Sequence, residues 1–242
     1  MPRATLPRNR IVRLSLDHQA ADLLREQLLS GRLKVGDRLI ESQMASELGV
    51  SRGTMRAALQ KLAAEGLIRQ VPFSWWTVAP LSPHDAWELY TLRASLEGLA
   101  ASLVAALPER SRRQPVGDAY EALKAACATG DYIRAAEVDL ALHRTMVESA
   151  GHERLLAHWR QIEQQTRLFL VSSNALLQSI GDIAQEHDAM VTAILAGDPE
   201  GADKAARALL LKDGADLVHH LETAERTAST PKARAGRRRG SA

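Results

Sequence analysis

Apolar residues recur every three or four positions along most of the chain, which is the spacing of one buried face of an α-helix. In the first 80 residues this pattern predicts three helices, each ending at or just before a glycine. We expect these helices over 17–31, 41–48 and 51–66. Asp17 and Ser51 are placed to cap the first and the third. Two β-prone runs follow, over 67–71 and 76–79, and predict a hairpin.

Beyond Pro80 the apolar pattern is helical throughout, and we expect no further strand. Ser82 followed by Pro83 is typical of a helix start, because serine caps a helix and proline suits its first position. We expect helices over 83–107, 115–129, 131–150, 152–178, 180–196 and 199–223. Glycines and short polar runs separate them, so the second part of the chain is predicted to be an all-α bundle of about six helices.

Charge is distributed unevenly along the chain. Residues 1–80 have an excess of five positive charges and residues 226–242 an excess of six, whereas residues 81–225 have an excess of nine negative charges. This division favours a polyanion-binding module joined to a domain of another kind. The alternative is a chance distribution of solvated surface charge.

Residues 41–59 have the spacing of a helix–turn–helix. Ala45 is small where the two helices would cross, Gly49 permits the tight turn, and Met55 would anchor the second helix in the core. In such motifs the N-terminal end of the second helix enters the major groove, where arginines contact guanine edges or phosphates and hydroxyls contact phosphates. The expected DNA contacts are Ser51, Arg52, Thr54 and Arg56. The alternative is a solvated basic face on a structural helix pair.

These patterns predict a mainly α chain, with an N-terminal winged helix–turn–helix whose wing is a small β-hairpin and a C-terminal all-α helical bundle. The expected parts are a flexible basic arm over 1–15, a DNA-binding domain over 16–80, an all-α domain over 81–225, and a basic disordered tail over 226–242.

Composition excludes other classes of protein. The single cysteine, Cys127, rules out a disulfide framework and a cysteine-based zinc finger. No run of about 18 apolar residues is present, so we expect neither a transmembrane helix nor a membrane partner. The first residues lack the apolar stretch of a secretory signal, and a cytoplasmic location is the default expectation.

The sequence over 28–68, LLSGRLKVGDRLIESQMASELGVSRGTMRAALQKLAAEGLI, resembles the N-terminal winged helix–turn–helix of GntR-family transcriptional regulators. The resemblance implies the same four contacts in the second helix. It adds Gln43, which stands where the family often has a contacting arginine. The wing departs from the family pattern, because Ser74 and Trp75 stand where the family often has Arg-Gly, and only glycine has the backbone freedom of that tip.

In the second domain, Asp139 and His143 are four residues apart, so both side chains project from one helical face. An oxygen and an imidazole placed in this way could hold a divalent metal, with His187 as a third ligand from another helix. The run DLALH that begins at Asp139, with the pair Glu186-His187, resembles the effector domain of the FadR-type subfamily, the FCD domain. That resemblance implies a metal such as zinc bound by one aspartate and three histidines. Leu209 stands where the fourth ligand is usual.

Two alternatives stay open for this domain. Three ligands can hold a metal whose open positions are filled by water or by an effector carboxylate, or the pocket can be metal-free, with Asp139 and His143 hydrogen-bonded together. Arg93 lies in the run YTLR, with Glu97 one turn later, and this segment also resembles the FCD domain. The resemblance implies that Arg93 meets an organic-acid effector, and the alternative is an internal ion pair with Glu97.

The resemblance implies that the all-α domain over 81–225 binds an effector and dimerises, and that the chain is a ligand-responsive DNA-binding regulator rather than an enzyme. We expect a homodimer that binds a palindromic operator, and a repressor that is released by a small organic acid bound in the bundle by Arg93, Asp139, His143 and His187. One alternative is an effector-independent DNA-binding protein with a degenerate sensor domain. The other is a metal-dependent enzyme, but no placed nucleophile, general base or phosphate-binding loop supports it.

Overall fold

A computed structural model of the chain describes residues 15–72, 74–79, 82–172 and 180–229. These residues form two compact units, one within 1–79 and the other within 80–242. The arm expected over 1–15 and most of the tail expected over 226–242 lie outside the described residues. Where the two expectations overlap the described chain, Ser15 precedes the first helix and residues 226–229 belong to the last.

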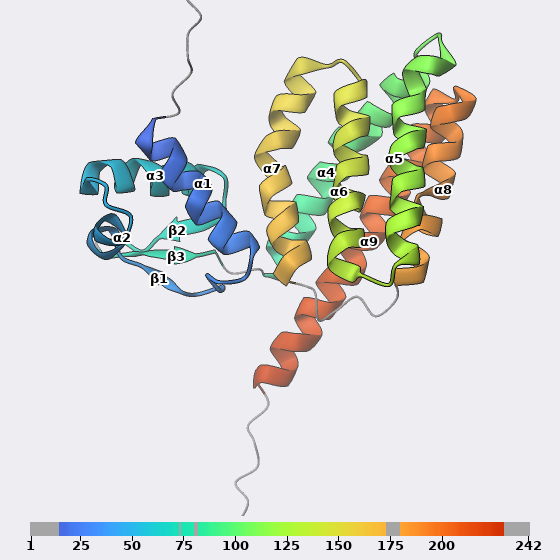
Figure 1. Cartoon of the computed structure of the whole chain (residues 1–242). Coiled ribbons are helices and arrows are strands. Elements are labelled where there is room, and N and C mark those ends of the chain that lie inside the picture. The colour runs from blue at the N-terminus through green and yellow to red at the C-terminus, as the bar shows by residue number, and fades with distance from the viewer. Residues whose placement is uncertain (1–14, 73, 80–81, 173–179, 230–242) are drawn as a thin grey trace, which may run out of the picture. The chain divides into compact units, whose positions relative to one another are not determined.

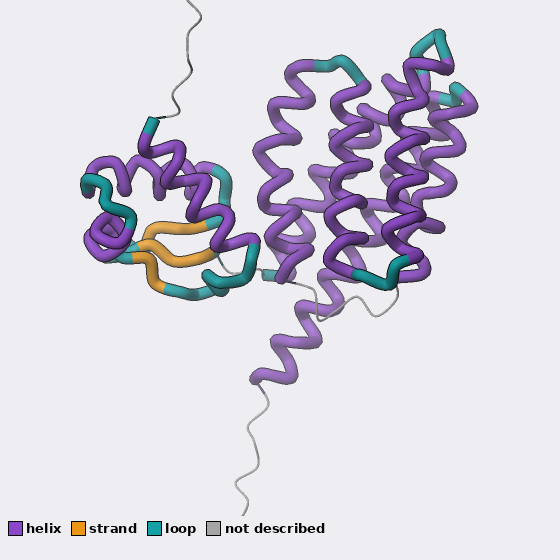
Figure 2. The backbone as a smooth tube through the Cα atoms, in the orientation of Figure 1, coloured by secondary structure: helices purple, strands orange, loops and turns teal. Residues whose placement is uncertain are grey.

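The first unit contains three helices and a three-stranded antiparallel sheet (Figure 2). Its elements are α1 (Leu16–Leu29), β1 (Arg38–Leu39), α2 (Glu41–Glu47), α3 (Arg52–Ala64), β2 (Ile68–Gln70) and β3 (Trp76–Val78). The sheet order is β1-β3-β2, and Thr77 of β3 pairs with both Arg38 and Arg69. The expected hairpin is β2–β3. Strand β1 was not expected, because two residues are too few to show an alternating pattern.

Local sequence explains how the helix–turn–helix forms. Gly49 follows the end of α2 and has a φ of +64°, in the left-handed region that favours glycine. This conformation turns the chain away from the helix axis. The Ser51 hydroxyl then accepts a hydrogen bond from the Thr54 amide at 3.0 Å and caps α3. Helix α1 begins one residue before Asp17, which was expected to cap it. Asp17 instead lies in the first turn and pairs with Lys61 of α3 at 2.6 Å.

The second unit consists, in the part that the structure describes, of six helices (Figure 1). They are α4 (Pro83–Ala105), α5 (Arg110–Ala128), α6 (Tyr132–Ser149), α7 (Glu153–Ser172), α8 (Ile180–Ala196) and α9 (Pro199–Ser229). Helix α4 packs against α6, α7, α8 and α9 and keeps one side exposed. The predicted fold class, a winged helix–turn–helix followed by an all-α bundle, is confirmed.

Two helix bounds differ from the expectation by five residues or more, and the expected end of the helix over 152–178 lies outside the described residues. Helix α5 begins at Arg110, whereas we expected it to begin at Pro115 because proline favours the first turn. Pro115 lies inside the helix, where it removes one backbone hydrogen bond without ending the helix. Helix α9 continues to Ser229, beyond the expected end at 223, because its last turns are polar and carry no apolar spacing to mark them.

The contact between α4 and α9 is unusually close at one point. A Cβ atom placed on Gly214 of α9 would lie 2.5 Å from the Cβ of Tyr90 on α4, so glycine is the residue that this approach permits. Tyr90 is buried, and so is Leu210 beside it on α9. Among the described helices, none is long and apolar enough to cross a membrane.

Candidate DNA interface and candidate metal centre

The four residues expected to contact DNA lie together at the N-terminal end of α3. Arg52 and Arg56 are exposed, and Thr54 is half-buried. The Ser51 hydroxyl caps the helix and lies 2.8 Å from the Thr54 hydroxyl. Each hydroxyl keeps hydrogen-bonding capacity beyond this local pair. The positive end of the helix dipole adds to the attraction of this surface for an anion.

Arg56 is held by a residue that sequence reasoning missed. Its guanidinium donates to the Glu41 carboxylate, from Nε at 3.1 Å and from Nη2 at 2.9 Å. Glu41 also accepts a hydrogen bond from Trp76 Nε1 at 3.1 Å, so one carboxylate joins α2, α3 and β3. The hydrogen bond from Arg56 lowers the pKa of Glu41, against the opposing effect of burial. Glu41, the first residue of the helix–turn–helix, was visible in the sequence as an acid, but its partners were not.

The remaining parts of this surface are Gln43 and the wing. Gln43 is exposed on α2 and donates to Glu47 at 2.9 Å. In the wing, the Arg38 guanidinium carbon lies 3.5 Å from the centroid of the Trp75 ring, a cation–π contact. The Trp75 side chain therefore packs against Arg38 of the sheet. The glycine of an Arg-Gly tip would have no side chain and would leave its backbone accessible. Contact of these residues with DNA stays a prediction.

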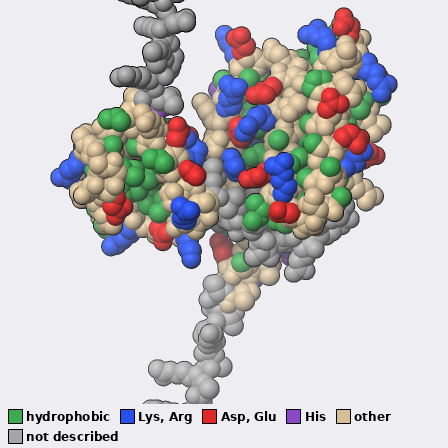
Figure 3. Space-filling model, viewed as in Figure 1, with side chains coloured by type: hydrophobic (Ala, Val, Ile, Leu, Met, Phe, Trp, Pro, Cys, Tyr) green, Lys and Arg blue, Asp and Glu red, His purple; other side chains and the backbone are tan. Residues whose placement is uncertain are grey.

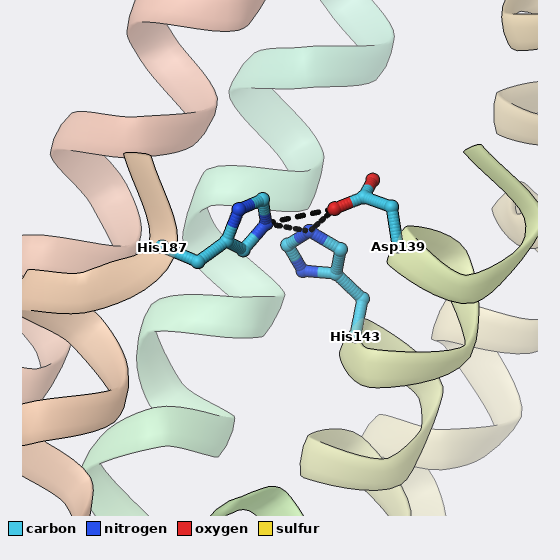
Figure 4. Close-up of side chains that lie close together, drawn as sticks. All are labelled: Asp139, His143 and His187. Carbon is cyan, nitrogen blue, oxygen red and sulfur yellow. Dashed lines mark hydrogen bonds and ion pairs between the residues drawn. The ribbon is translucent and has the colours of Figure 1, made fainter. Parts of the chain in front are cut away.

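In the second unit, the three expected metal ligands converge inside the bundle (Figure 4). Asp139 and His143 come from α6 and His187 from α8. The two Nε2 atoms are 3.1 Å apart, and Asp139 Oδ1 lies 2.9 Å from Nε2 of His187 and 3.8 Å from Nε2 of His143. Both histidines are buried. The expected alternative, a hydrogen bond between Asp139 and His143, is not formed at 3.8 Å.

The outer nitrogens of both rings face acceptors, which fixes what the inner nitrogens can do. His143 Nδ1 lies 2.5 Å from Glu97 Oε2, and His187 Nδ1 lies 2.7 Å from the Ile183 carbonyl oxygen. With a proton on each Nδ1, both Nε2 lone pairs face the centre of the site, where the two Nε2 atoms are 3.1 Å apart. Metal-binding histidines in proteins are oriented by hydrogen bonds of this kind.

This donor set fits a divalent metal. Asp139 Oδ1 is fully buried and has no hydrogen bond of good geometry to any described residue. Two imidazole nitrogens and a carboxylate oxygen thus face one another across 2.9 to 3.8 Å. Ligands at typical zinc distances are separated by roughly 3.3 Å in a tetrahedral site. Without a metal, an additional proton must occupy the space between the two Nε2 atoms and Asp139 Oδ1. Burial lowers the pKa of His187, but the Asp139 carboxylate outweighs it and raises the pKa to about 9.

Glu97 is the centre of a second, fully buried set of contacts. Its carboxylate accepts from Arg93 Nε at 2.8 Å and from Trp159 Nε1 at 3.0 Å, in addition to facing His143. Burial would raise the pKa of Glu97, but Arg93 and His143 outweigh it and hold the pKa well below its usual range. Of the two alternatives for Arg93, the structure shows the ion pair with Glu97. Contact of Arg93 with an effector stays a prediction.

Leu209, at the position of the usual fourth ligand, is buried among the apolar side chains of the bundle. Sequence reasoning identified the three candidate ligands but did not foresee that the Glu97 carboxylate lies 2.5 Å from His143 Nδ1, and it missed Trp159 altogether. Trp159 follows Glu97 by 62 residues, and no local motif connects them. His152 caps the next helix, because its Nδ1 accepts from the Leu155 amide at 3.2 Å.

A winged helix–turn–helix followed by a helical domain with a buried histidine–aspartate cluster defines a class of DNA-binding transcriptional regulators. The chain belongs to the gntR family of bacterial regulatory proteins. The model of that family matches residues 16–74, and the FCD domain matches residues 88–212. These are families of regulators, so the chain is not an enzyme, and the alternative of a metal-dependent enzyme is excluded.

Named relatives agree with this assignment. The chain is 33% identical, over 88% of each chain, to a probable D-xylose utilization operon transcriptional repressor of Paenarthrobacter nicotinovorans. It is 26% identical to the gluconate operon transcriptional repressor of Bacillus licheniformis, over 69% of this chain and 68% of the relative. The solved structure of McbR/YncC from E. coli has the same fold, with a TM-score of 0.69 at 22% identity, over 86% of this chain and 99% of that one.

Proposed function

We propose that the protein is a ligand-responsive repressor. It binds operator DNA through α3 and is released when a small organic acid binds in the helical unit. Repression is supported by the two relatives named as repressors of sugar and gluconate operons. The observation that carries the proposal is the pair of exposed arginines at the capped N-terminus of α3, Arg52 and Arg56, within a family of DNA-binding regulators.

The metal and the effector belong to one site. Asp139, His143 and His187 hold a divalent metal such as zinc, and Glu97 keeps His143 in the required tautomer. When bound, the metal supplies positive charge and open coordination positions for an oxygen ligand. The buried arginine, Arg93, is already neutralised by Glu97, so the carboxylate of the effector is attracted mainly by the metal. Release from DNA requires that the effector binds the two states of the protein with different affinity.

The exposed side of α4 is the surface best suited to a second copy of the chain. It carries three large apolar side chains in water, Trp87, Leu92 and Leu99, which are between 42% and 55% exposed. Between them, the hydroxyls of Thr91 and Ser95 bond back to the carbonyls of their own helix and need no outside partner. By contrast, the face drawn in Figure 3, over α5, α6 and α7, carries acidic and basic side chains interspersed.

A two-fold dimer through α4 gives the two recognition helices that a palindromic operator needs. Light scattering should then give twice the chain mass of 26.4 kDa.

The DNA proposal is tested by Arg52→Ala. This change removes an exposed guanidinium that no described residue holds in an ion pair, so the fold should be unaffected. Binding to a selected operator should weaken by about 1–3 kcal/mol, as expected for a lost base contact. The matched control is Arg154→Ala, which removes the same charge from an exposed position of α7. Fluorescence anisotropy at fixed salt measures both. Equal binding by Arg52→Ala and the wild-type protein would show that α3 is not the reading helix.

A further inference from the structure

The sheet of the first unit has two faces of different character. One face carries apolar side chains that are buried in the core, Leu39, Ile68, Trp76 and Val78. Successive side chains of a strand point to opposite faces, and residues paired across antiparallel strands share a face. Arg38 and Arg69 both pair with Thr77, so the two arginines lie on the other face, in one row across the sheet. Both are exposed, and we call this side of the sheet the outer face.

Trp75 holds one of these arginines in place. It stands two residues before Thr77, so it lies on the outer face as a diagonal neighbour of Arg38. The Arg38 guanidinium carbon is 3.5 Å from the centroid of the Trp75 ring. A guanidinium that stacks on an aromatic face keeps its in-plane N–H groups available as donors. Trp75 therefore orients Arg38 without using its hydrogen-bonding capacity.

A chain of contacts connects the outer face with the N-terminal end of α3. Arg56 of α3 donates to Glu41 at 2.9 Å, and Glu41 accepts a hydrogen bond from Trp76 Nε1 at 3.1 Å. Trp76 directly follows Trp75, with its side chain on the opposite face of the sheet. Strand β1 leads into α2, and β3 begins at the same end of the sheet, beside the helix–turn–helix (Figure 1). The arginines of the sheet and of α3 therefore adjoin one another.

The charge and the spacing of the two arginines on the outer face fit a phosphate backbone. No described residue accepts a hydrogen bond from the side chain of Arg38 or Arg69, and no described carboxylate forms an ion pair with either. The two arginines lie on strands on either side of β3, so their Cα atoms are roughly 10 Å apart. One strand of a duplex carries a negative charge about every 3.4 Å along the helix axis, so a backbone can meet both arginines at once.

We propose that the outer face of the sheet binds the DNA backbone through Arg38 and Arg69, next to the bases that α3 reads. Trp75 is a positioning residue, which directs the Arg38 guanidinium at a phosphate. Such contacts add affinity and fix the orientation of the protein on the duplex, but they carry no sequence information. This inference rests on the proposed function, because it requires α3 to bind the same duplex.

The test compares two duplexes of equal length, a selected operator and a random sequence. Fluorescence anisotropy with the full chain gives the Kd for each between about 50 and 200 mM salt. Arg38→Ala should weaken binding to both duplexes by the same factor and lower the slope of log K against log salt by about 0.9. The ratio of the Kd values of variant and wild type should therefore fall roughly 3-fold over this range. Arg69→Ala should behave in the same way. The matched control is Arg154→Ala, an exposed arginine of α7, which should change neither quantity.

The positioning role of Trp75 is tested by a double-mutant cycle. Trp75→Ala should weaken binding to both duplexes, whereas Trp75→Phe keeps an aromatic face and should bind nearly as well as the wild-type protein. In the Arg38→Ala background, Trp75→Ala should have no further effect, because residues that act through one another are not additive. A full effect in that background would show that Trp75 does not act through Arg38. Circular dichroism melts check that each variant is folded.

The outcomes separate this inference from the proposed function. If Arg38→Ala leaves the Kd and the salt slope unchanged while Arg52→Ala weakens operator binding, the inference is wrong and α3 remains the reading helix. If Arg38→Ala weakens binding to the operator alone, Arg38 contacts bases and the backbone contact is excluded. A wild-type protein that binds the operator no better than the random duplex would overturn both the proposed function and the inference.

Discussion

The two units each contain an arginine–glutamate pair, in opposite surroundings. Arg56 and Glu41, next to the helix that is proposed to read DNA, have side chains that are 59% and 16% exposed. Arg93 and Glu97, in the helical unit, are 4% and 0% exposed. Arg56, the exposed member of the first pair, is solvated by water and can exchange its partner for a phosphate at modest cost, while the half-buried Glu41 keeps its hydrogen bond from Trp76. The buried pair cannot separate without leaving a charge in an apolar interior.

This difference suits the two tasks. A surface that binds DNA needs arginines that are free to change partners, and in the proposed function a DNA phosphate replaces Glu41 as the partner of Arg56. A buried site needs groups that stay fixed, and Glu97 fixes three at once: Arg93, His143 and Trp159. The predictions below test whether the two regions differ in this way, beginning with the largest effect.

Replacing Glu97 by glutamine should be severely destabilising. The substitution keeps the shape of the side chain but leaves the Arg93 guanidinium buried without a counter-charge. Loss of one partner from a buried pair costs about 3–5 kcal/mol. The control is Glu121→Gln, which breaks the pair of Glu121 with Lys124, where both side chains are at least 45% exposed. The control should change the free energy by less than about 1 kcal/mol. Urea unfolding followed by circular dichroism measures both, and similar values for the two variants would contradict the contrast between buried and exposed pairs.

Glycine to alanine changes should have opposite signs in the two units. Gly214→Ala would place a Cβ 2.5 Å from the Cβ of Tyr90, so α4 and α9 must move apart, which costs about 1–3 kcal/mol. At Gly53 of α3 the nearest atom, Ser51 Oγ, is 3.7 Å from the added Cβ, and there is room for it. Alanine favours a helix over glycine by up to about 1 kcal/mol, so Gly53→Ala should be neutral or stabilising. Thermal melts of both variants measure whether each substitution raises or lowers the stability. A stabilising Gly214→Ala would mean that α4 and α9 are not in close contact at this residue.

The sequence indicated the parts of the molecule that depend on local pattern. The cap at Ser51 and the turn at Gly49 follow from a few adjacent residues, and the i, i+4 pair of Asp139 and His143 follows from helix geometry alone. The three metal-ligand candidates were found in this way, with the help of a resemblance, and the structure brings them together.

The parts that sequence reasoning missed depend on packing between distant segments. Trp159 meets Glu97 across 62 residues, and Trp76 meets Glu41 across 35. No local pattern encodes such a pair, because the crossing of two elements decides which side chains touch.

The smallest effect is expected at the exposed pair, where it should depend on pH. The hydrogen bond from Arg56 lowers the pKa of Glu41 in the folded protein below its ordinary value of 4.5. A lowered carboxyl pKa stabilises the fold above the unfolded value, and that contribution is lost as the pH falls through the folded pKa. At pH 7 the wild-type protein should exceed Glu41→Gln in stability by less than about 1 kcal/mol. The difference should shrink as the pH is lowered below 4.5. Urea unfolding of both proteins between pH 7 and pH 4 measures it, and a difference that grows toward low pH would show that Glu41 acts through its neutral form, as a hydrogen-bond partner of Trp76, and not through its charge on Arg56.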